Sequence, residues 1–315
     1  MRVKKNLMKK ILSAVFVLCL LPCSCKTVHV PESWLFVKAP YDYGSYRDHI
    51  LNSGWEEADK QYFEGVLNSL VDTEDEVLGS RNSCAIGRGY FEREGYPRLE
   101  YIEFTPSEYD KTGIFFLGSG SDVFTISKEL EELSVDSASK IYVLNYRGYG
   151  KSEGSPSFTT VFDDDAAFAD FIESKGDGMD FVIGYSLGSV PATYLATGRG
   201  VGKLVLMAPL SDAGAAFTHM KRQYTEGWKV VLRPFLKVSA DDYLNDISNC
   251  AKIADYPGEL LIIHGTADEA LPYKMGKGLY EASGSAGKRL ITIKDGGHAA
   301  PFEEEYLDEI AEFLR

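Results

Sequence analysis

Three polar residues of this 315-residue chain have the side chains that hydrolytic acyl transfer needs, and each follows a short apolar run. Ser186 lies in the segment GYSLG, Asp268 ends the segment HGTAD, and His298 ends the segment KDGGH. A serine hydroxyl is a poor nucleophile at neutral pH unless a base such as histidine takes its proton, and a carboxylate must orient that histidine. We therefore predict a triad in which Ser186 is the nucleophile, His298 the base and Asp268 the acid.

Two neighbouring residues compete for the base and acid roles. His264 is a second candidate base, although its place at a strand end beside the acid favours a structural hydrogen bond. Glu269 is a second candidate acid, with a longer side chain than the aspartate before it. The alternative to the triad as a whole is that its members have ordinary structural roles. His298 would then lie in a solvated loop, and Asp268 would cap the start of a helix. The remaining histidines have no partner pattern and are interpreted as incidental: His29, His49 and His219.

The tetrahedral intermediate of acyl transfer also needs two hydrogen-bond donors for its oxyanion. The backbone N–H of Leu187, directly after the nucleophile, is predicted to be one donor. The N–H of Ser119 is predicted to be the other, because the loop 117–122 follows a predicted strand and its glycines let the backbone approach a substrate. A flexible Gly-Ser turn is the alternative interpretation of that loop.

These residues can meet only if the segments before them are strands of one sheet. Six short apolar runs alternate with helical stretches, which is the pattern of a mostly parallel sheet with helices on both faces. The runs are 113–117, 140–144, 180–183, 203–207, 259–263 and 290–293. Ligands of such sheets bind at the carboxyl ends of the strands, where all three triad residues fall. The sequence therefore predicts an α/β fold with its site at that end.

Two further elements are predicted upstream of these runs. Residues 53–71 should form a helix, because Ser53 and Glu56 fit a capping box and apolar residues recur every four positions after them. Residues 89–104 should form two short strands joined by a turn at 95–97.

The first 24 residues, 1–24, are predicted to be a secretory signal peptide. Met1–Lys10 carries five basic residues and no acid, and 11–21 is almost entirely apolar but too short to span a bilayer as a helix. Cys25 follows a small residue and resembles the acylated cysteine of a bacterial lipoprotein signal. We therefore expect an exported cell-envelope protein anchored to a membrane surface by lipid at Cys25, followed by a tether at 26–32. An ordinary signal peptide, leaving a secreted or periplasmic protein, is the alternative.

Composition narrows the choice of partners. Hydrophobic residues make up 44% of the chain, enough for a globular core, and the net charge is −14. This charge argues against binding to nucleic acid, whose phosphates need clustered Lys and Arg. The sequence has no motif for a metal, nucleotide or dinucleotide, so no metal and no cofactor are predicted. Cys84 and Cys250 either pair in an oxidising compartment or stay two separate buried thiols.

Residues 87–315 resemble the α/β-hydrolase superfamily. Besides the triad segments, the resemblance rests on NYRGYGKSEG at 145–154 and on LIIHGTAD at 261–268. These residues are most similar to the short-lid branch that contains palmitoyl-protein thioesterases, lysophospholipases and monoacylglycerol-type lipases. The resemblance implies an α/β-hydrolase fold, with a mostly parallel central sheet flanked by helices and a short lid at about 210–257. It also implies a structural role for Arg147, in support of the pocket wall.

The chain departs from that family at two places. The family usually has His-Gly before a small residue in the oxyanion loop, where this chain has Leu117-Gly118-Ser119. Because the family's histidine at this position commonly orders the loop, its replacement by Leu117 is expected to change the geometry of the loop more than the activity. Residues 25–86, the predicted tether and helical N-terminal extension, lie outside the resemblance.

The predicted function is that of a serine hydrolase that cleaves a small-molecule carboxylic ester or thioester through an acyl-enzyme on Ser186. Within the lid, 228–236 is apolar with two cations, and it either lines an acyl pocket, meets lipid or packs on the core. Two other functions stay open. One is a serine peptidase of the aminopeptidase type on the same fold, and the other is a non-catalytic envelope-binding lipoprotein that uses 26–86 for interaction.

Overall fold

The computed structural model describes most of the chain beyond the predicted signal peptide. The described residues are 26–30, 32, 35–36, 48, 52, 56–72, 77–121, 123–224, 236–240 and 242–315. The predicted signal peptide, the lipidation residue Cys25, the cap residue Ser53 and most of the apolar lid segment, 228–235, lie outside these ranges. Within them, no helix is both long and apolar enough to cross a bilayer.

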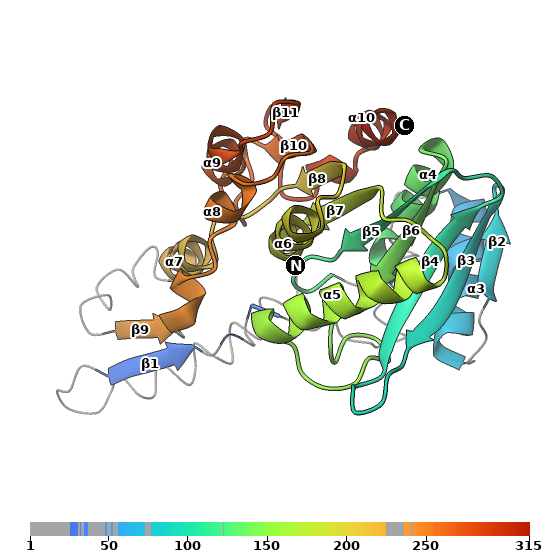
Figure 1. Ribbon diagram of the computed structural model, residues 1–315, viewed down its shortest axis with the longest axis horizontal. Helices are drawn as coiled ribbons and strands as arrows, with labels where there is room; N and C mark the ends of the chain where they lie inside the picture. Colours follow the sequence, from blue (N-terminus) through green and yellow to red (C-terminus); the bar gives the residue numbers. More distant parts are fainter. Residues whose placement is uncertain are drawn as a thin grey trace.

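Nine strands of the described chain form a twisted central sheet in the order β11-β10-β8-β7-β5-β6-β4-β3-β2 (Figure 1). The strands from β6 through β5, β7, β8 and β10 to β11 pair in parallel, while β2, β3 and β4 add an antiparallel end. Their bounds are β2 Val77–Arg81, β3 Cys84–Phe91, β4 Leu99–Pro106, β5 Lys111–Phe116, β6 Ser139–Leu144, β7 Phe181–Tyr185, β8 Lys203–Met207, β10 Glu259–Gly265 and β11 Lys288–Ile293. All six predicted runs are strands, and the predicted pair around the turn at 95–97 is β3 and β4, so the predicted α/β-hydrolase fold is confirmed.

Helices cover both faces of the sheet. On one face α5, α6, α8 and α9 contact one another in that order, and on the other face α3, α4 and α10 do so (Figure 1). Their bounds are α3 Glu57–Asp72, α4 Ser127–Asp136, α5 Phe158–Ser174, α6 Ser189–Arg199, α8 Asn249–Ile253, α9 Lys274–Ala282 and α10 Glu304–Leu314. The helix predicted at 53–71 is α3, which begins at Glu57 in the structure.

The middle strands are buried on both faces, as a parallel sheet requires. Every residue of β6 and β7 is buried, and side chains such as Phe115 and Phe181 are fully enclosed. Each large apolar side chain buried in this way stabilises the fold by about 1.5–3 kcal/mol. Helix α5 adds Val161, Phe168 and Ile172 to the same core. The carboxyl ends of the strands are thereby held on a rigid base.

A second, two-stranded sheet joins the N-terminal segment to the lid. Strand β1, Lys26–Val30, pairs in parallel with β9, Leu236–Ala240, which lies in the predicted lid between β8 and β10 (Figure 1). The segment predicted as a tether therefore contains a strand, because its backbone N–H and C=O groups bond to the lid strand. The lid also contains helix α7, Ala213–Tyr224.

The N-terminal extension continues into the main sheet. Residues 86 and 87, where the hydrolase domain was predicted to begin, are neighbours within β3. Farther upstream, Leu35 and Phe36 are buried in the core, and the Glu32 carboxylate accepts a hydrogen bond from the backbone N–H of Phe158 at the start of α5. Extension and hydrolase domain thus share one core.

Candidate active site

The nucleophile turn lies between β7 and α6. Ser186 opens a short 3-10 turn, Ser186–Gly188, and has a φ of 54°, a left-handed conformation that costs energy for a residue with a side chain. Gly188 makes the turn possible, because a Cβ at this position would overlap the carbonyl oxygens of Phe116 and Leu117 at the end of β5. The turn therefore presses against the neighbouring strand and presents the Ser186 hydroxyl at the carboxyl ends of the strands.

The loops that carry the acid and the base are held together by their backbones. After β10, the N–H of Thr266 donates to Ile293 O at 2.9 Å and the N–H of Ala267 donates to Gly296 O at 2.9 Å. Gly265 allows this approach, since a Cβ there would overlap Gly296 O. The loop after β10 and the loop after β11 consequently behave as one unit that sets the relative positions of Asp268 and His298.

The structure brings the three predicted triad residues into one hydrogen-bonded chain. Nε2 of His298 lies 3.0 Å from the Ser186 hydroxyl oxygen, and its Nδ1 lies 2.7 Å from Asp268 Oδ2. The Asp268 side chain is buried, whereas the His298 side chain is 25% exposed. A substrate can therefore reach the serine and the imidazole, while the carboxylate is shielded from water.

Asp268 is surrounded by donors. Its Oδ1 accepts hydrogen bonds from the backbone N–H groups of Ala270 at 2.8 Å and Leu271 at 2.9 Å, and His264 Nε2 lies 3.2 Å from Oδ2. Burial by itself raises the pKa of Asp268, but hydrogen bonds from His264 and His298 outweigh it and hold the pKa well below its usual range. The carboxylate is thus charged at neutral pH.

The competing residues have other positions. His264 is fully buried beside the acid, where its Nε2 also lies 2.9 Å from Leu271 O, whereas the imidazole bonded to the serine is that of His298. Glu269 is exposed, and its backbone oxygen lies 3.1 Å from Nε2 of His219 on lid helix α7. His264 is placed to support the acid, and His219, interpreted from sequence as incidental, joins the lid to the loop of the acid.

Both predicted oxyanion donors flank the nucleophile. Leu187 is buried in the turn directly after Ser186. Ser119 lies in the loop after β5, next to Gly118, at which a Cβ would be 3.1 Å from the Ser186 Cβ. This loop is a closed turn, with the Ser121 N–H donating to Gly118 O at 3.2 Å. The two amides therefore lie on the two backbone segments that border the serine.

One contact of the base was not expected from the sequence. The Tyr185 ring packs against the His298 ring, with centroids 5.2 Å apart, and the Tyr185 hydroxyl lies 3.4 Å from His298 O. Tyr185 in turn makes an edge contact with Phe302, at 4.8 Å between centroids. A tyrosine before the nucleophile could have been noticed, but its partner 113 positions later could not be identified from the sequence.

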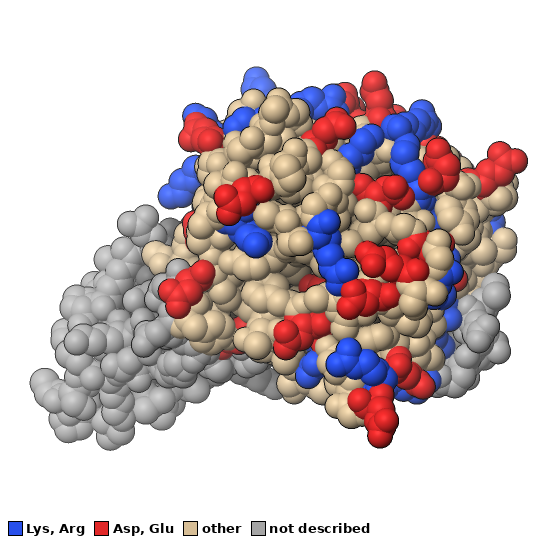
Figure 2. Space-filling model, in the orientation of Figure 1, with Lys and Arg blue, Asp and Glu red and all other residues tan. Residues whose placement is uncertain are grey.

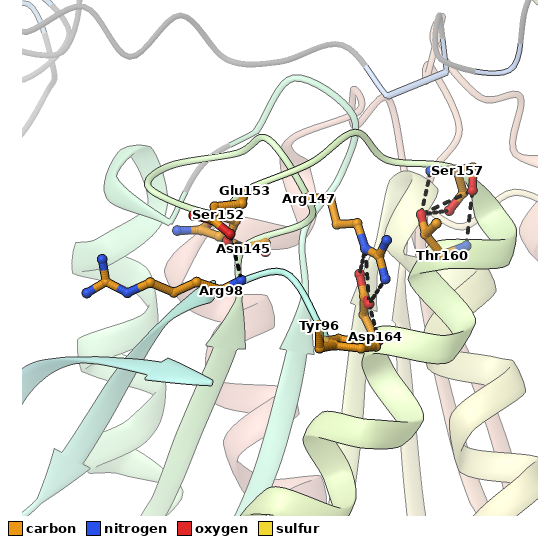
Figure 3. A network of polar contacts seen from close by, with 9 residues as sticks. All are labelled: Tyr96, Arg98, Asn145, Arg147, Ser152, Glu153, Ser157, Thr160 and Asp164. Atoms are coloured by element: carbon orange, nitrogen blue, oxygen red, sulfur yellow. Dashed lines mark hydrogen bonds and ion pairs between the residues drawn. The ribbon is translucent and has the colours of Figure 1, made fainter. Parts of the chain in front are cut away.

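Arg147 pairs with a carboxylate of α5 and has no contact with the triad among the hydrogen bonds of the described residues. Its guanidinium makes three hydrogen bonds of 2.7, 2.8 and 3.2 Å to Asp164 on α5, and the Tyr96 hydroxyl donates to the same carboxylate (Figure 3). The nearby Glu153 carboxylate accepts from the backbone N–H of Arg98 at 3.0 Å. These contacts tie the loop 145–154 to α5 and to the turn between β3 and β4.

A buried carboxylate holds the start of the same loop. Glu100 is fully buried, 3.1 Å from Arg88 Nε, and it accepts hydrogen bonds of 2.8 Å from the Asn145 amide and from the Lys151 backbone. Ser152 completes the network by accepting from the Glu100 N–H at 2.9 Å. The loop after β6 is therefore fastened to β4 through Glu100.

The described residues include no cluster of three or more His, Cys, Asp or Glu side chains that could hold a metal ion. Cys84 in β3 and Cys250 in α8 are both free thiols and do not form a disulfide, although only one of the two is buried as that alternative expected. Cys84 is buried and Cys250 is partly exposed. Burial raises the pKa of both thiols to about 11, which leaves them protonated at neutral pH.

Sheet order, nucleophile turn and triad together define an α/β hydrolase. The family model described as the alpha/beta hydrolase family matches residues 114–313. The chain belongs to this family.

The chain is similar to individual proteins at low sequence identity. The chain is 27% identical over 181 residues to the uncharacterized protein YfhR of Escherichia coli K12, covering 55% of this chain and 60% of that protein. It is 27% identical over 207 residues to alpha/beta hydrolase domain-containing protein 17B of Xenopus laevis, covering 64% of this chain and 66% of that protein. The chain therefore spans under two thirds of the length of these curated relatives.

Among solved structures, the esterase Pf2001 of Pyrococcus furiosus superposes with a TM-score of 0.59 at 18% identity. The superposition covers 75% of this chain and 93% of the esterase. At this identity, the similarity shows a shared fold.

Proposed function

We propose that this protein is a serine hydrolase that cleaves a small carboxylic ester or thioester through an acyl-enzyme on Ser186. The observation that carries the proposal is the continuous hydrogen-bonded chain from the Ser186 hydroxyl through His298 to the buried, charged Asp268, at 3.0 and 2.7 Å. Nucleophile, base and orienting carboxylate are then all within the reach that proton transfer requires.

The charged carboxylate of Asp268 sets the tautomer of the base. A charged carboxylate at 2.7 Å holds a proton on Nδ1 of His298, which leaves the lone pair of Nε2 directed at the serine hydroxyl. In that tautomer His298 can accept the Ser186 proton as attack begins. The resulting imidazolium is stabilised by the same carboxylate.

Acylation follows from this arrangement. Ser186 Oγ forms a bond to the carbonyl carbon while its proton moves to His298 Nε2, and the carbonyl electron pair moves to oxygen, beside the amides of Leu187 and Ser119. When the intermediate collapses, the bond to the leaving oxygen or sulfur breaks, and the leaving group takes the proton from His298. Water then attacks the acyl-enzyme by the same steps and regenerates Ser186.

Active-site labelling tests the mechanism. A fluorophosphonate probe should form one adduct per chain in the wild type and none in Ser186→Ala, whose kcat should fall by about 10⁴- to 10⁶-fold. Ser174→Ala, which removes an exposed hydroxyl on α5, is the matched control and should label normally. An unlabelled wild-type chain would instead favour the non-catalytic binding function.

The substrate class is proposed from the fold and from the lid. The solved structure that superposes on this chain is named an esterase, and α7 and β9 lie between β8 and β10, where the resemblance implied a lid. A series of p-nitrophenyl esters from short to long acyl chains, run beside peptide p-nitroanilides, separates esterase from peptidase. Faster turnover of the anilides would reject the ester proposal in favour of the peptidase.

Surface charge also supports a small acyl substrate over a polyanion. The chain has a net charge of −14, and acidic and basic side chains are interspersed over the described part of the face in Figure 2. Nucleic-acid phosphates are bound by clustered Lys and Arg.

We further propose that the protein is an exported lipoprotein of the cell envelope, acylated on Cys25. One support is the signal-like sequence of residues 1–24. Another is that β1 begins at Lys26, directly after the proposed anchor, and pairs with β9, so that the anchor would keep the lid beside the membrane surface. Metabolic labelling with a radioactive fatty acid should mark the wild type and leave Cys25→Ser unmarked. Equal recovery of both chains in the soluble fraction would reject the anchor.

A further inference from the structure

Two tyrosines in the loop after β6 contact both sides of the oxyanion loop. We propose that Tyr146 and Tyr149 are positioning residues that hold the Ser119 N–H in place for the tetrahedral intermediate. The inference rests on the proposed function and concerns residues outside the triad. It is carried by two hydrogen bonds and by the rigid support of the tyrosines.

Tyr146 holds the peptide group before the one that carries the Ser119 N–H. Its hydroxyl donates to Leu117 O at 2.9 Å, so it bonds the peptide between Leu117 and Gly118. Tyr146 is buried, and burial raises the pKa of its hydroxyl well above the usual value. The phenol is therefore a permanent hydrogen-bond donor to this carbonyl.

Tyr149 holds the peptide group on the other side. Burial raises the pKa of the Tyr149 hydroxyl, and a hydrogen bond with the backbone of Gly120 acts in the opposite direction. Only a donor lowers the pKa of a phenol, so we assign this bond to the Gly120 N–H, which belongs to the peptide between Ser119 and Gly120. The peptide between Gly118 and Ser119, whose N–H is the predicted oxyanion donor, thus lies between two peptides that each bond a tyrosine hydroxyl. The carbonyl of this middle peptide, Gly118 O, also accepts a hydrogen bond from the Ser121 N–H. The orientation of the middle peptide is therefore set by the two flanking peptides and by the closed turn.

The tyrosines are themselves braced. Their rings make an edge contact with centroids 5.4 Å apart, and the N–H of Tyr149 donates to Tyr146 O at 2.8 Å. Phe36 of the N-terminal segment packs its ring edge against Tyr146, with centroids 5.8 Å apart, and against Phe158 at 5.1 Å. Glu100 also bonds Asn145 and Lys151 of the same loop, on either side of the two tyrosines. The N-terminal extension therefore supports the oxyanion loop through Phe36.

This support matters because an oxyanion donor acts only when its hydrogen lies within bonding distance of the developing charge. Loss of a whole donor costs about 10²- to 10³-fold in kcat, so a displaced donor should cost less. We expect Tyr146→Phe and Tyr149→Phe each to lower kcat by roughly tenfold to a hundredfold, with KM changed by less than about threefold. The affinity for an aryl boronic acid, which forms a tetrahedral adduct on Ser186, should fall in parallel with kcat.

Tyr256→Phe is the matched control. Tyr256 is equally buried, and its hydroxyl donates to a backbone carbonyl, Val201 O, at 3.0 Å in a distant part of the sheet. A purely structural role for Tyr146 and Tyr149 would give all three variants the same small change in kcat and a similar loss of thermal stability. That result, or an unchanged boronic-acid affinity, would overturn the inference.

The proposed function is checked first and separately. Stoichiometric fluorophosphonate labelling of the wild type and of both variants establishes a working nucleophile, so a fall in kcat then reports on the oxyanion loop. Two independent variants keep the test decisive if one of them folds poorly. An unlabelled wild type would overturn the proposed function, and this inference with it.

Discussion

His264 Nε2 lies 3.2 Å from Asp268 Oδ2, the same oxygen that receives Nδ1 of His298 at 2.7 Å. Two imidazoles thus share one buried carboxylate oxygen, and the imidazole of His298 is the one that also bonds the nucleophile. His264 is held in turn by Leu271 O at 2.9 Å and by Gly276, at which a Cβ would overlap the His264 ring. His264, which the sequence offered as a second candidate for the base, therefore helps to orient the acid, Asp268.

We predict that His264→Phe lowers kcat by roughly tenfold to a hundredfold. Removing the orienting carboxylate altogether costs about 10⁴-fold, and a carboxylate that is only less firmly held should cost less. The substitution removes one of the two side-chain donors that hold the pKa of Asp268 down, so the carboxylate is less firmly fixed. His264→Gln, which keeps an N–H in reach, should lose less. Steady-state kinetics on the best ester substrate measure both, and equal losses in the two variants would contradict the role assigned to the N–H.

Asp268→Asn should affect both activity and stability. The variant leaves the base in the wrong tautomer, so kcat should fall by about 10⁴-fold. The pKa of Asp268 is lower in the folded than in the unfolded chain, so ionisation stabilises the wild type above the unfolded pKa of about 4. That contribution is lost as the pH falls from about 4 through the lower folded pKa.

Urea denaturation of the wild type and of Asp268→Asn across pH 2 to about 7 measures this contribution. The difference in free energy of unfolding between the two chains should be largest above about pH 5 and should shrink below about pH 4. A difference that stays constant over the whole range would mean that the carboxylate is not stabilised by its partners.

The sheet and the triad were predictable because their signals are local. A strand such as β7 is a short apolar run that ends at the turn of Ser186, and parallel strands place their carboxyl ends together. Gly188 and Gly265 stand where the backbone comes too close to another strand or loop for any side chain. The apolar runs and the glycines beside Ser186 and Asp268 are visible within a few adjacent residues, whereas the residues that these glycines approach are not.

Other contacts depend on residues far apart and have no such pattern. Strand β1 is five residues long and pairs with β9, more than 200 positions later, so 26–32 resembled a tether. The phenol of Tyr146 meets the carbonyl of Leu117, which lies 29 positions earlier, and the sequence contains only an ordinary tyrosine. Backbone partners are set by tertiary packing, which composition and periodicity do not report.

Gly265→Ala should destabilise the protein and lower its activity together. The added Cβ would overlap Gly296 O and push apart the loops that carry Asp268 and His298. We expect a loss of about 1–3 kcal/mol in the free energy of unfolding and a fall in kcat. Gly278→Ala in helix α9, where a Cβ meets no atom within 4 Å, is the control. It should gain about 0.5–1 kcal/mol and keep its activity.

Asp165→Asn should stabilise the protein at neutral pH. Asp165 on α5 is only 2% exposed, and neither carboxylate oxygen has a hydrogen-bond partner among the residues that the structure describes. Burial, and then the charge of Asp164, raises the pKa of Asp165 well above its usual value. The folded chain therefore keeps a proton that the unfolded chain releases above about pH 4, so wild-type stability falls as the pH rises from there.

The uncharged, similarly shaped asparagine removes this penalty. The gain in free energy of unfolding over the wild type should be near zero at about pH 3 and should reach about 1–3 kcal/mol at neutral pH. Asp170→Asn, at an exposed position on the same helix, should show no such growth with pH. Equal stability of wild type and Asp165→Asn at every pH would mean that this carboxyl has a partner in solution, such as an ordered water, that keeps it ionised.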